Sequence, residues 1–256
     1  MSSAVLLCLT AAFFLTAVIS VVTGGTSLVT VPVMMQCGVD PRVAVATNML
    51  ALVFLSLGGT LPFIKSECLP RDRLSWLVAL TLVSSALGAL LLLALPARAI
   101  PTVVAVAMLA VVALTLARPR AGLSGAVVGP SRPAVAKGYA MTFVLGVYGG
   151  FFSGGYVAFL TAAYVAFFGM TFTEAVATTK VLNVGSSLVA TAVFAAQGLV
   201  DWRLGALLGA VSFAGGLVGG LAARRMGNLW LRRVFLAAVI VLAVKTLFWA
   251  VGRPPG

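Results

Sequence analysis

Long apolar stretches alternate with short polar connections along the whole chain. A helix that crosses a bilayer needs about 20 consecutive apolar residues, and each stretch reaches or approaches that length. Of the 256 residues, 62% are hydrophobic and 9% are charged, whereas soluble domains are about 45–50% apolar and about 25% charged. The pattern therefore predicts an all-α polytopic membrane protein. The apolar stretches are 4–35, 43–64, 74–95, 99–117, 138–168, 175–197, 203–223 and 230–250.

The chain divides into two similar halves. Its longest polar interruption, Arg118 to Lys137, contains three prolines and three glycines and predicts a flexible connector. We therefore expect a first membrane repeat at 1–118, a connecting loop at 119–137 and a second membrane repeat at 138–256, as in many secondary transporters. The matches that indicate duplication are Ala44–Thr47 with Ala175–Thr178 at a shift of 131, Gly24–Gly25 with Gly154–Gly155 at 130, Leu87–Leu90 with Val218–Leu221, and Asp72 with Asp201.

The first stretch of each half is too long for one crossing. Residues 4–35 number 32 and residues 138–168 number 31, against a usual maximum of roughly 25. Each contains glycines, at 24–25 in the first half and between 149 and 155 in the second. Each stretch is therefore either one long kinked helix or a re-entrant hairpin that returns to the side it entered.

The basic residues distinguish these alternatives. Eight simple spans would place nine of the loop lysines and arginines on one side and six on the other, whereas two hairpins give eleven against four. Cytoplasmic loops are the more basic ones, so we favour a glycine-broken, re-entrant first segment plus three transmembrane helices in each half, with eight simple spans as the alternative. Three crossings per half make the repeats inverted. Both termini are then predicted outside and the main basic loops in the cytoplasm.

The composition excludes most catalytic chemistry. The chain has no histidine, its three cysteines (Cys8, Cys37 and Cys68) are far apart, and no GxxxxGK[ST] loop occurs. Histidine is the usual general base and a common metal ligand, and no pair of carboxylates lies inside a predicted span. We therefore expect no enzyme, no cofactor, no metal site and no ATP-driven pump. The net charge of +12 reflects basic membrane loops, and we expect no nucleic-acid partner.

The two glycine breaks form the candidate binding site. Broken helices at matching positions of two halves indicate the substrate site of a transporter, because unpaired backbone at membrane depth must be buried or line a cavity. The N–H groups at the start of a half-helix carry partial positive charge and bind anions. The alternative is that the glycines serve only helix packing. The candidate residues at the breaks are Thr23, Gly24, Gly25, Thr26, Ser27, Ser153, Gly154 and Gly155.

A polar segment inside the sixth apolar stretch supplies a second candidate feature. Lys180 lies six residues into this stretch, and Asn183 follows on the same helical face. An ionisable group at such depth costs roughly 2.5–3.5 kcal/mol and usually faces a cavity or a partner. The alternative is that Lys180 extends to the membrane surface or pairs with Glu174. The candidate residues are Thr178, Thr179, Lys180 and Asn183, opposed in the first half by Thr47 and Asn48.

Short motifs in both halves resemble those of one family of membrane proteins. They are GGTSLVTVP at 24–32 and AVATN at 44–48, followed in the second half by GGFFSGG at 149–155, ATTK at 177–180 and GLVDW at 198–202. In this order and spacing they are similar to the sulfite exporter TauE/SafE family. The resemblance implies a bacterial cytoplasmic-membrane protein with a duplicated helical fold that moves sulfite, organosulfonates or related small anions. The second half lacks the proline that follows the glycines at Pro32, a departure that bears on the substrate more than on the fold.

We therefore expect a secondary transporter, a permease or exporter of a small oxyanion, in the bacterial inner membrane. Its partners would be the anion and the lipid bilayer, and a homo-oligomer stays open. A non-transporting scaffold or assembly factor is the main alternative, and a membrane-embedded enzyme is disfavoured by the missing histidines. Because moving one negative charge outward through about 100 mV releases about 2.3 kcal/mol, export would need no coupling group.

Overall fold

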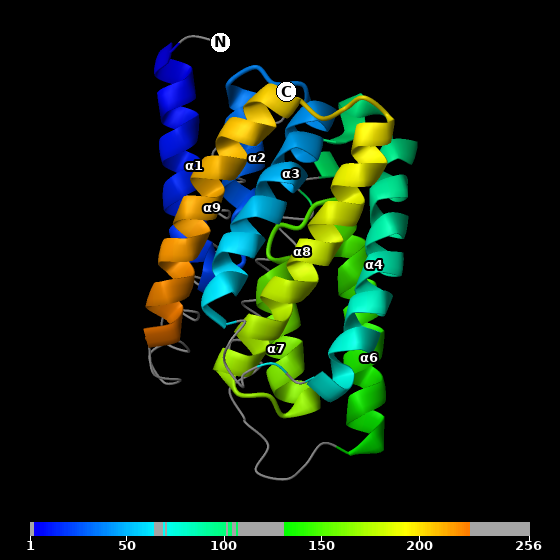
Figure 1. Cartoon of the computed structure of the whole chain (residues 1–256). Coiled ribbons are helices and arrows are strands. Elements are labelled where there is room, and N and C mark those ends of the chain that lie inside the picture. The colour runs from blue at the N-terminus through cyan, green and yellow to red at the C-terminus, as the bar shows by residue number, and fades with distance from the viewer. Residues whose placement is uncertain are drawn as a thin grey trace.

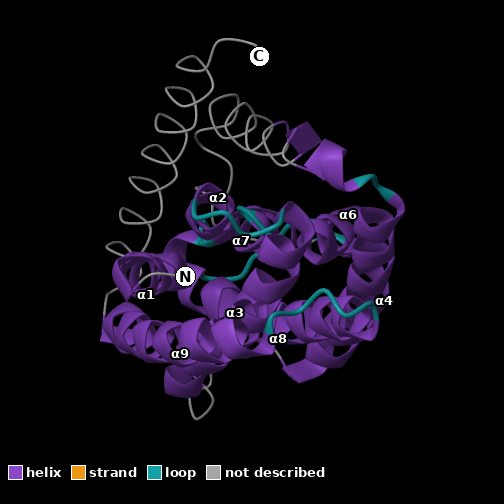
Figure 2. Cartoon of the chain, turned by 90° about the horizontal axis from the view of Figure 1, so that it is seen from above, coloured by secondary structure: helices purple, strands orange, loops and turns teal. Residues whose placement is uncertain are grey.

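The described part of the protein is a bundle of helices. The computed structural model describes residues 3–63, 69, 71–100, 102, 103, 106 and 131–225, and Figures 1 and 2 show their arrangement. No strand occurs among these residues, which confirms the all-α prediction. The helices are α1 (Ser3–Thr23), α2 (Ser27–Gln36), α3 (Pro41–Thr60), α4 (Arg71–Ala94), α6 (Arg132–Phe151), α7 (Tyr156–Phe168), α8 (Phe172–Ala196) and α9 (Trp202–Arg225), with short 3₁₀ helices at Leu61–Phe63 and Ala97–Ala99.

Five segments of the described chain are long and apolar enough to cross a membrane. They are Ser3–Val21, Pro41–Phe63, Asp72–Ala94, Phe172–Ala196 and Trp202–Arg225. The helices α2 and α7 are apolar but shorter, with 10 and 13 residues. Of the other predicted stretches, 99–117 lies mostly and 230–250 entirely outside the described residues.

Each of the two overlong stretches folds as a pair of helices that run back along each other. In Figure 1, α1 descends and α2 returns toward the end from which α1 came, whereas α6 and α7 enter and leave from the opposite end. Contacts within the second pair agree, because a Cβ added to Gly138 near the start of α6 would lie 2.6 Å from the ring of Phe168 at the end of α7. Helix α6 begins at Arg132, inside the expected connector, since Ser131 caps it and Pro133 fits its first turn.

The first helix of each half packs against a helix of the other half. Helix α1 packs on α9 of the other half, and α6 packs on α4 in the same way, while α3 and α8 pack together in the middle. The α4–α6 and α1–α9 contacts are both close because glycine lies at each of them. A Cβ on Gly88 would collide with the carbonyl oxygen of Val147, and a Cβ on Gly219 would collide with that of Val18. Gly88 and Gly219 are related by the same shift as Ala44 and Ala175, so positions that the predicted repeat makes equivalent form similar contacts.

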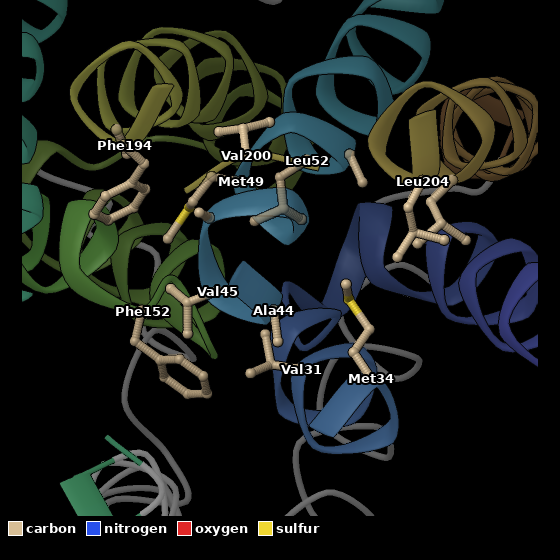
Figure 3. Packing of buried hydrophobic residues seen from close by; sticks show 14 of the residues in the cluster. Val31, Met34, Ala44, Val45, Met49, Leu52, Phe152, Phe194, Val200 and Leu204 are labelled. Atoms are coloured by element: carbon tan, nitrogen blue, oxygen red, sulfur yellow. The ribbon is translucent and has the colours of Figure 1, made fainter. Parts of the chain in front are cut away.

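The core surrounds the point where the breaks lie. Phe152, next to the second break, is fully buried in the same cluster as Val31 of α2 and Val45 of α3. Figure 3 shows Phe152 beside Val45, and Val31 beside Ala44. The apolar packing of these side chains holds both broken pairs against the central helices.

Candidate functional site

The first break has a left-handed glycine and an uncapped helix start. Gly24 has φ +65°, and its N–H donates to the carbonyl oxygen of Ser20 at 2.8 Å, an arrangement that ends α1. Thr26 occupies the N-cap position of α2, but its hydroxyl donates to Ser20 Oγ and makes no capping bond to α2. In the described residues no hydrogen bond uses the N–H groups of Thr26 and Ser27. These donors are therefore free at the start of α2.

The second break is similar in kind. Ser153 has φ +64° and Gly155 has φ +81°, and Gly155 occupies the N-cap position of α7 without a side-chain cap. The hydroxyl of Tyr148 donates to the carbonyl oxygen of Gly154 at 2.5 Å, which fixes the loop against α6. Ser153 is buried, and its N–H donates to the carbonyl oxygen of Tyr148 at 3.3 Å.

These two helix starts differ from the other helix starts whose caps the structure describes. Helices α3, α6, α8 and α9 each begin with a side chain that accepts a backbone N–H: Asp40, Ser131, Thr171 and Asp201. The first N–H groups of any helix lack partners within the helix and must be satisfied otherwise. These four helices are thus capped by their own sequence, whereas α2 keeps the N–H groups of Thr26 and Ser27 without a partner among the described residues. At the start of α7 the N–H groups of Gly155 and Tyr156 donate to backbone carbonyl oxygens.

The two breaks touch each other through their main chains. The N–H of Gly155 donates to the carbonyl oxygen of Gly24 at 3.1 Å. A Cβ on Gly24 would lie 2.6 Å from Val157 Cβ and 2.7 Å from the nitrogen of Ala158, so only glycine allows this approach. The structure therefore brings both predicted glycine clusters, which are far apart in sequence, into one place.

Lys180 reaches the first break from α8. Its side chain is 1% exposed, and Nζ donates to the carbonyl oxygen of Ser20 at 3.0 Å. This oxygen also accepts the N–H of Gly24 and lies in the last turn of α1, the negative end of the helix dipole. The alternative roles for Lys180 are wrong: it does not extend to the surface, and Glu174 instead accepts the N–H of Thr171 in a capping box.

The ammonium group of Lys180 has little compensation. Of its three N–H donors, one has an acceptor among the described residues, and that acceptor is a neutral carbonyl. The single ion pair within the described ranges joins Arg73 to Asp72, so no described carboxylate balances Lys180. A buried positive charge without a counterion is costly, and it favours a negatively charged ligand.

Polar pairs flank the breaks in both halves. Asn48 of α3 donates to Ser27 Oγ at 2.9 Å and accepts from Thr30 Oγ1 at 2.7 Å. The shift that relates Ala44 to Ala175 takes Thr30 to Thr161 and Asn48 to Thr179. The hydroxyls of Thr161 and Thr179 lie 3.2 Å apart. The same shift thus relates a hydrogen bond between α2 and α3 to one between α7 and α8.

One polar pair at the middle of the bundle has no duplicate. Asn183 of α8 donates to Ser56 Oγ of α3 at 2.6 Å. The matching positions under the same shift are Leu52 and Ser187, and leucine offers no donor. Accordingly, the hydroxyl of Ser187 and Oδ1 of Asn183 are buried without a partner in the described part of the chain. The site is therefore polar and asymmetric at its centre.

One predicted site residue faces elsewhere, and another makes no side-chain hydrogen bond within the described part of the chain. Thr47 Oγ1 accepts the N–H of Asp201 at 3.1 Å, so this hydroxyl stabilises the start of α9 and does not reach the breaks. Thr178 is buried, and its hydroxyl has no partner among the residues described. Thr23 and Gly25 are buried at the first break.

Five residues whose hydrogen bonds hold these contacts were absent from the sequence prediction. They are Ser20, Thr30, Ser56, Tyr148 and Thr161. The signal for Thr30 and Thr161 was available, because they repeat at the shift already seen in Ala44–Thr47 and Ala175–Thr178. Ser20 is the one residue with a hydroxyl between Thr16 and Thr23 in an apolar stretch. Its backbone carbonyl accepts from Lys180, and a backbone acceptor has no signal in the sequence.

The arrangement is that of a polar centre buried inside an apolar helical bundle. No group of three or more potential metal ligands occurs among the described residues. Among the described residues, five segments are long and apolar enough to cross a membrane, and two shorter apolar helices begin at the breaks. This defines a multi-pass membrane protein.

Comparisons with known proteins identify the family. Residues 9–246 match the family described as "Sulfite exporter TauE/SafE", and the chain belongs to this family of transporters, which are not enzymes. No solved structure matches the chain.

Curated bacterial relatives match almost end to end. A "Probable membrane transporter protein" of Haemophilus influenzae is 25% identical over 92% of this chain and 91% of its own length. "Probable membrane transporter protein ORF9" of a Sinorhizobium species is 28% identical over 92% and 90%. "Probable membrane transporter protein YfcA" of Escherichia coli K12 is 26% identical over 91% and 86%.

Proposed function

We propose that the protein is a secondary transporter of a small oxyanion, and that the anion binds where the two helix breaks meet. The observation that carries this proposal is the buried ammonium of Lys180, which has one neutral acceptor beside Gly24 and no carboxylate among the described residues. An anion at this position would supply the missing negative charge.

The free N–H groups of Thr26 and Ser27 at the first break and the positive ends of two helix dipoles provide the remaining recognition. The starts of α2 and α7 have no side-chain cap, and each carries the partial positive charge of a helix N-terminus. Several oxygens on one small anion can accept hydrogen bonds from an ammonium and from backbone N–H groups together. The fourteen residues predicted as the site contribute unequally, with Thr47 turned toward α9.

The fold supports a mechanism of alternating access. We infer that 1–118 and 138–256 are inverted repeats, because α1 packs on α9 as α6 packs on α4 and the two broken pairs enter from opposite ends. Transporters built in this way rock one repeat against the other around a fixed site. In this proposal both termini are outside, and the basic loops, including the start of α6, are cytoplasmic.

Sulfite and organosulfonates are the proposed substrates. The family's description as a sulfite exporter supports this class, and a cationic site without carboxylates suits any small oxyanion. We propose export from the bacterial cytoplasm, because the membrane potential alone drives an anion outward and no predicted span contains a carboxylate to couple an uphill movement.

Flux measurements in proteoliposomes test the proposal. Radiolabelled sulfite, sulfate, an alkylsulfonate and a carboxylate would be compared for the wild-type protein and for Lys180→Gln, which keeps the length of the side chain and removes its charge. We expect flux of at least one sulfur oxyanion, reduced at least tenfold in Lys180→Gln.

Lys137→Gln is the matched control, because Lys137 is exposed near the start of α6 and its loss should leave flux unchanged. Lack of flux for every anion would overturn the transport proposal. Full flux in a correctly folded Lys180→Gln variant would remove the lysine from the mechanism.

A further inference from the structure

An aromatic cluster lies at the end of the α6–α7 pair where α6 begins and α7 ends. The ring of Phe168, the last residue of α7, lies 5.2 Å from that of Tyr164 and 5.4 Å from that of Tyr139. The guanidinium carbon of Arg73 on α4 lies 5.4 Å from the centroid of the Phe168 ring, a cation–π contact. Gly138 leaves the space that this ring fills.

A depression of the surface lies directly outside this cluster. Its volume is about 200 Å³, and it is lined by Asp72, Arg73, Phe168, Gly169, Met170 and Glu174. Phe168 therefore contacts the depression on one side and the buried aromatic rings on the other, with 5% of the residue exposed. It is the point where the depression ends and the packed interior begins.

Hydroxyl groups continue inward from the cluster along one face of α7. The hydroxyl of Tyr164 lies 3.1 Å from that of Thr142, and one turn deeper Thr161 pairs with Thr179, the neighbour of Lys180 in sequence. Positions 168, 164, 161 and 157 share a helical face, and Val157 contacts Gly24. This face connects the depression to the meeting point of the breaks.

The other broken pair has no such cluster. The shift that relates the two halves places Cys37, Val33 and Cys8 at the positions equivalent to Phe168, Tyr164 and Tyr139. Duplication would give both pairs the same closure, so the aromatic rings are a property of the second pair alone.

We propose that Phe168 is a gate on a route between this depression and the anion site, and that Arg73 holds its ring in the closed position. The inference rests on the proposed function, since it names the route to the same site. When the ring swings away from Tyr139 and Tyr164, the hydroxyls of Tyr164 and Thr161 become the polar lining along which a small anion passes. The gate opens on the side of the membrane that Arg73 faces.

Thiol labelling measures this gate directly. Cys8, Cys37 and Cys68 are replaced by alanine, and Thr161→Cys places one thiol behind the ring. The probe is a sulfonated methanethiosulfonate, a small anionic thiol reagent. We expect slow labelling with Phe168 present, at least tenfold faster labelling with Phe168→Ala, and a several-fold increase with Arg73→Gln.

Three controls make the result specific. Phe168→Leu keeps most of the buried volume and should give an intermediate labelling rate. It serves as the test variant in case Phe168→Ala folds poorly. Phe167→Ala removes the neighbouring, partly buried ring and should leave labelling slow. In vesicles of opposite orientation, the reagent should reach the thiol faster from the side of Arg73.

The gate is overturned when Phe168→Ala and Phe168→Leu leave the rate unchanged, when Phe167→Ala accelerates it equally, or when labelling is faster from the other side. Labelling does not require transport. Absence of anion flux together with labelling that depends on Phe168 would therefore refute the proposed function alone. Flux that depends on Lys180 together with labelling that does not depend on Phe168 would refute the gate alone.

Discussion

The backbone N–H of Gly155 donates to the carbonyl oxygen of Gly24 at 3.1 Å, and the two glycines are separated by the same shift that relates Ala44 to Ala175. Both have positive φ. In a structure with a two-fold relation between its halves, residues that contact their own equivalents lie close to the axis. With the proposed inverted repeats, Gly24 and Gly155 would therefore lie close to the two-fold axis, where the proposed anion would be shared by both halves.

Replacing Gly24 tests this contact. Gly24→Ala forces a Cβ to within 2.6 Å of Val157 Cβ and 2.7 Å of the Ala158 nitrogen, and it adds the strain of a positive φ. Left-handed strain costs about 1 kcal/mol and overpacking about 1–3 kcal/mol, so we expect a loss of about 2–4 kcal/mol in the free energy of unfolding in detergent.

Gly38→Ala is the control for backbone strain. Gly38 has φ +84° but nothing lies within 4 Å of an added Cβ, so its replacement should cost about 1 kcal/mol. Equal losses in the two variants would mean that the breaks do not press on each other.

The glycine contacts between α4 and α6 and between α1 and α9 should respond to substitution in the same way. Gly88→Ala meets the backbone of α6 and Gly219→Ala that of α1, and a backbone atom cannot move aside as a side chain can. We expect each substitution to lower the melting temperature in detergent by a similar amount, corresponding to about 1–3 kcal/mol. Gly185→Ala is the control, because its nearest neighbour is the flexible end of Leu82 at 3.1 Å. A large effect in only one of the first two variants would contradict the equivalence of the two helix pairs.

The duplicated polar pairs allow a double-mutant cycle in each half. The pair Thr30→Val with Asn48→Leu, and the pair Thr161→Val with Thr179→Val, each isolate one interhelical hydrogen bond. Asn48→Leu also removes the bond to Ser27 Oγ, but this loss is present with and without Thr30→Val and cancels in the cycle. We expect coupling energies of about 0.6 kcal/mol, rising to about 1.7 kcal/mol for the shorter bond of Thr30. The crossed pair of Thr30 and Thr179 shares no hydrogen bond and should show none beyond error. An equal coupling energy in the crossed pair would mean that the substitutions loosen helix packing in general and that the coupling does not come from the hydrogen bonds.

The sequence predicted the helical class and the two breaks because both depend on local composition. Apolar length alone defines a membrane helix, and the stretch 4–35, with Gly24 inside it, is too long to be one simple crossing. The bonds of Lys180 could not be predicted in this way. Its acceptor is the backbone carbonyl of Ser20, in the other half of the chain, and any residue type at position 20 would supply one.

Thr47 illustrates the opposite error. Its place beside Asn48 suggested a shared role, but adjacent residues on a helix point about 100° apart. Asn48 consequently faces α2, whereas Thr47 faces the start of α9. The repeat that revealed the breaks also contained Thr30 and Thr161, and applying its shift to single hydroxyls would have found them.

The orientation of the helices can be decided with two exposed positions, Ala136 and Gln197. Ala136 lies in the first turns of α6 and Gln197 caps the end of α8. Re-entrant pairs place them on opposite sides of the membrane, whereas eight simple spans place them on the same side. In a background without Cys8, Cys37 and Cys68, we expect an impermeant thiol reagent added to intact cells to label Gln197→Cys and to leave Ala136→Cys unlabelled until the membrane is opened. Gln36→Cys, at the end of α2, should behave as Gln197→Cys does, because a returning pair brings position 36 back to the side from which α1 entered. Equal behaviour of Ala136→Cys and Gln197→Cys in intact cells, both labelled or both unlabelled, would establish simple crossings. It would remove the basis for inverted repeats, since two parallel halves would no longer present their breaks from opposite sides to one anion.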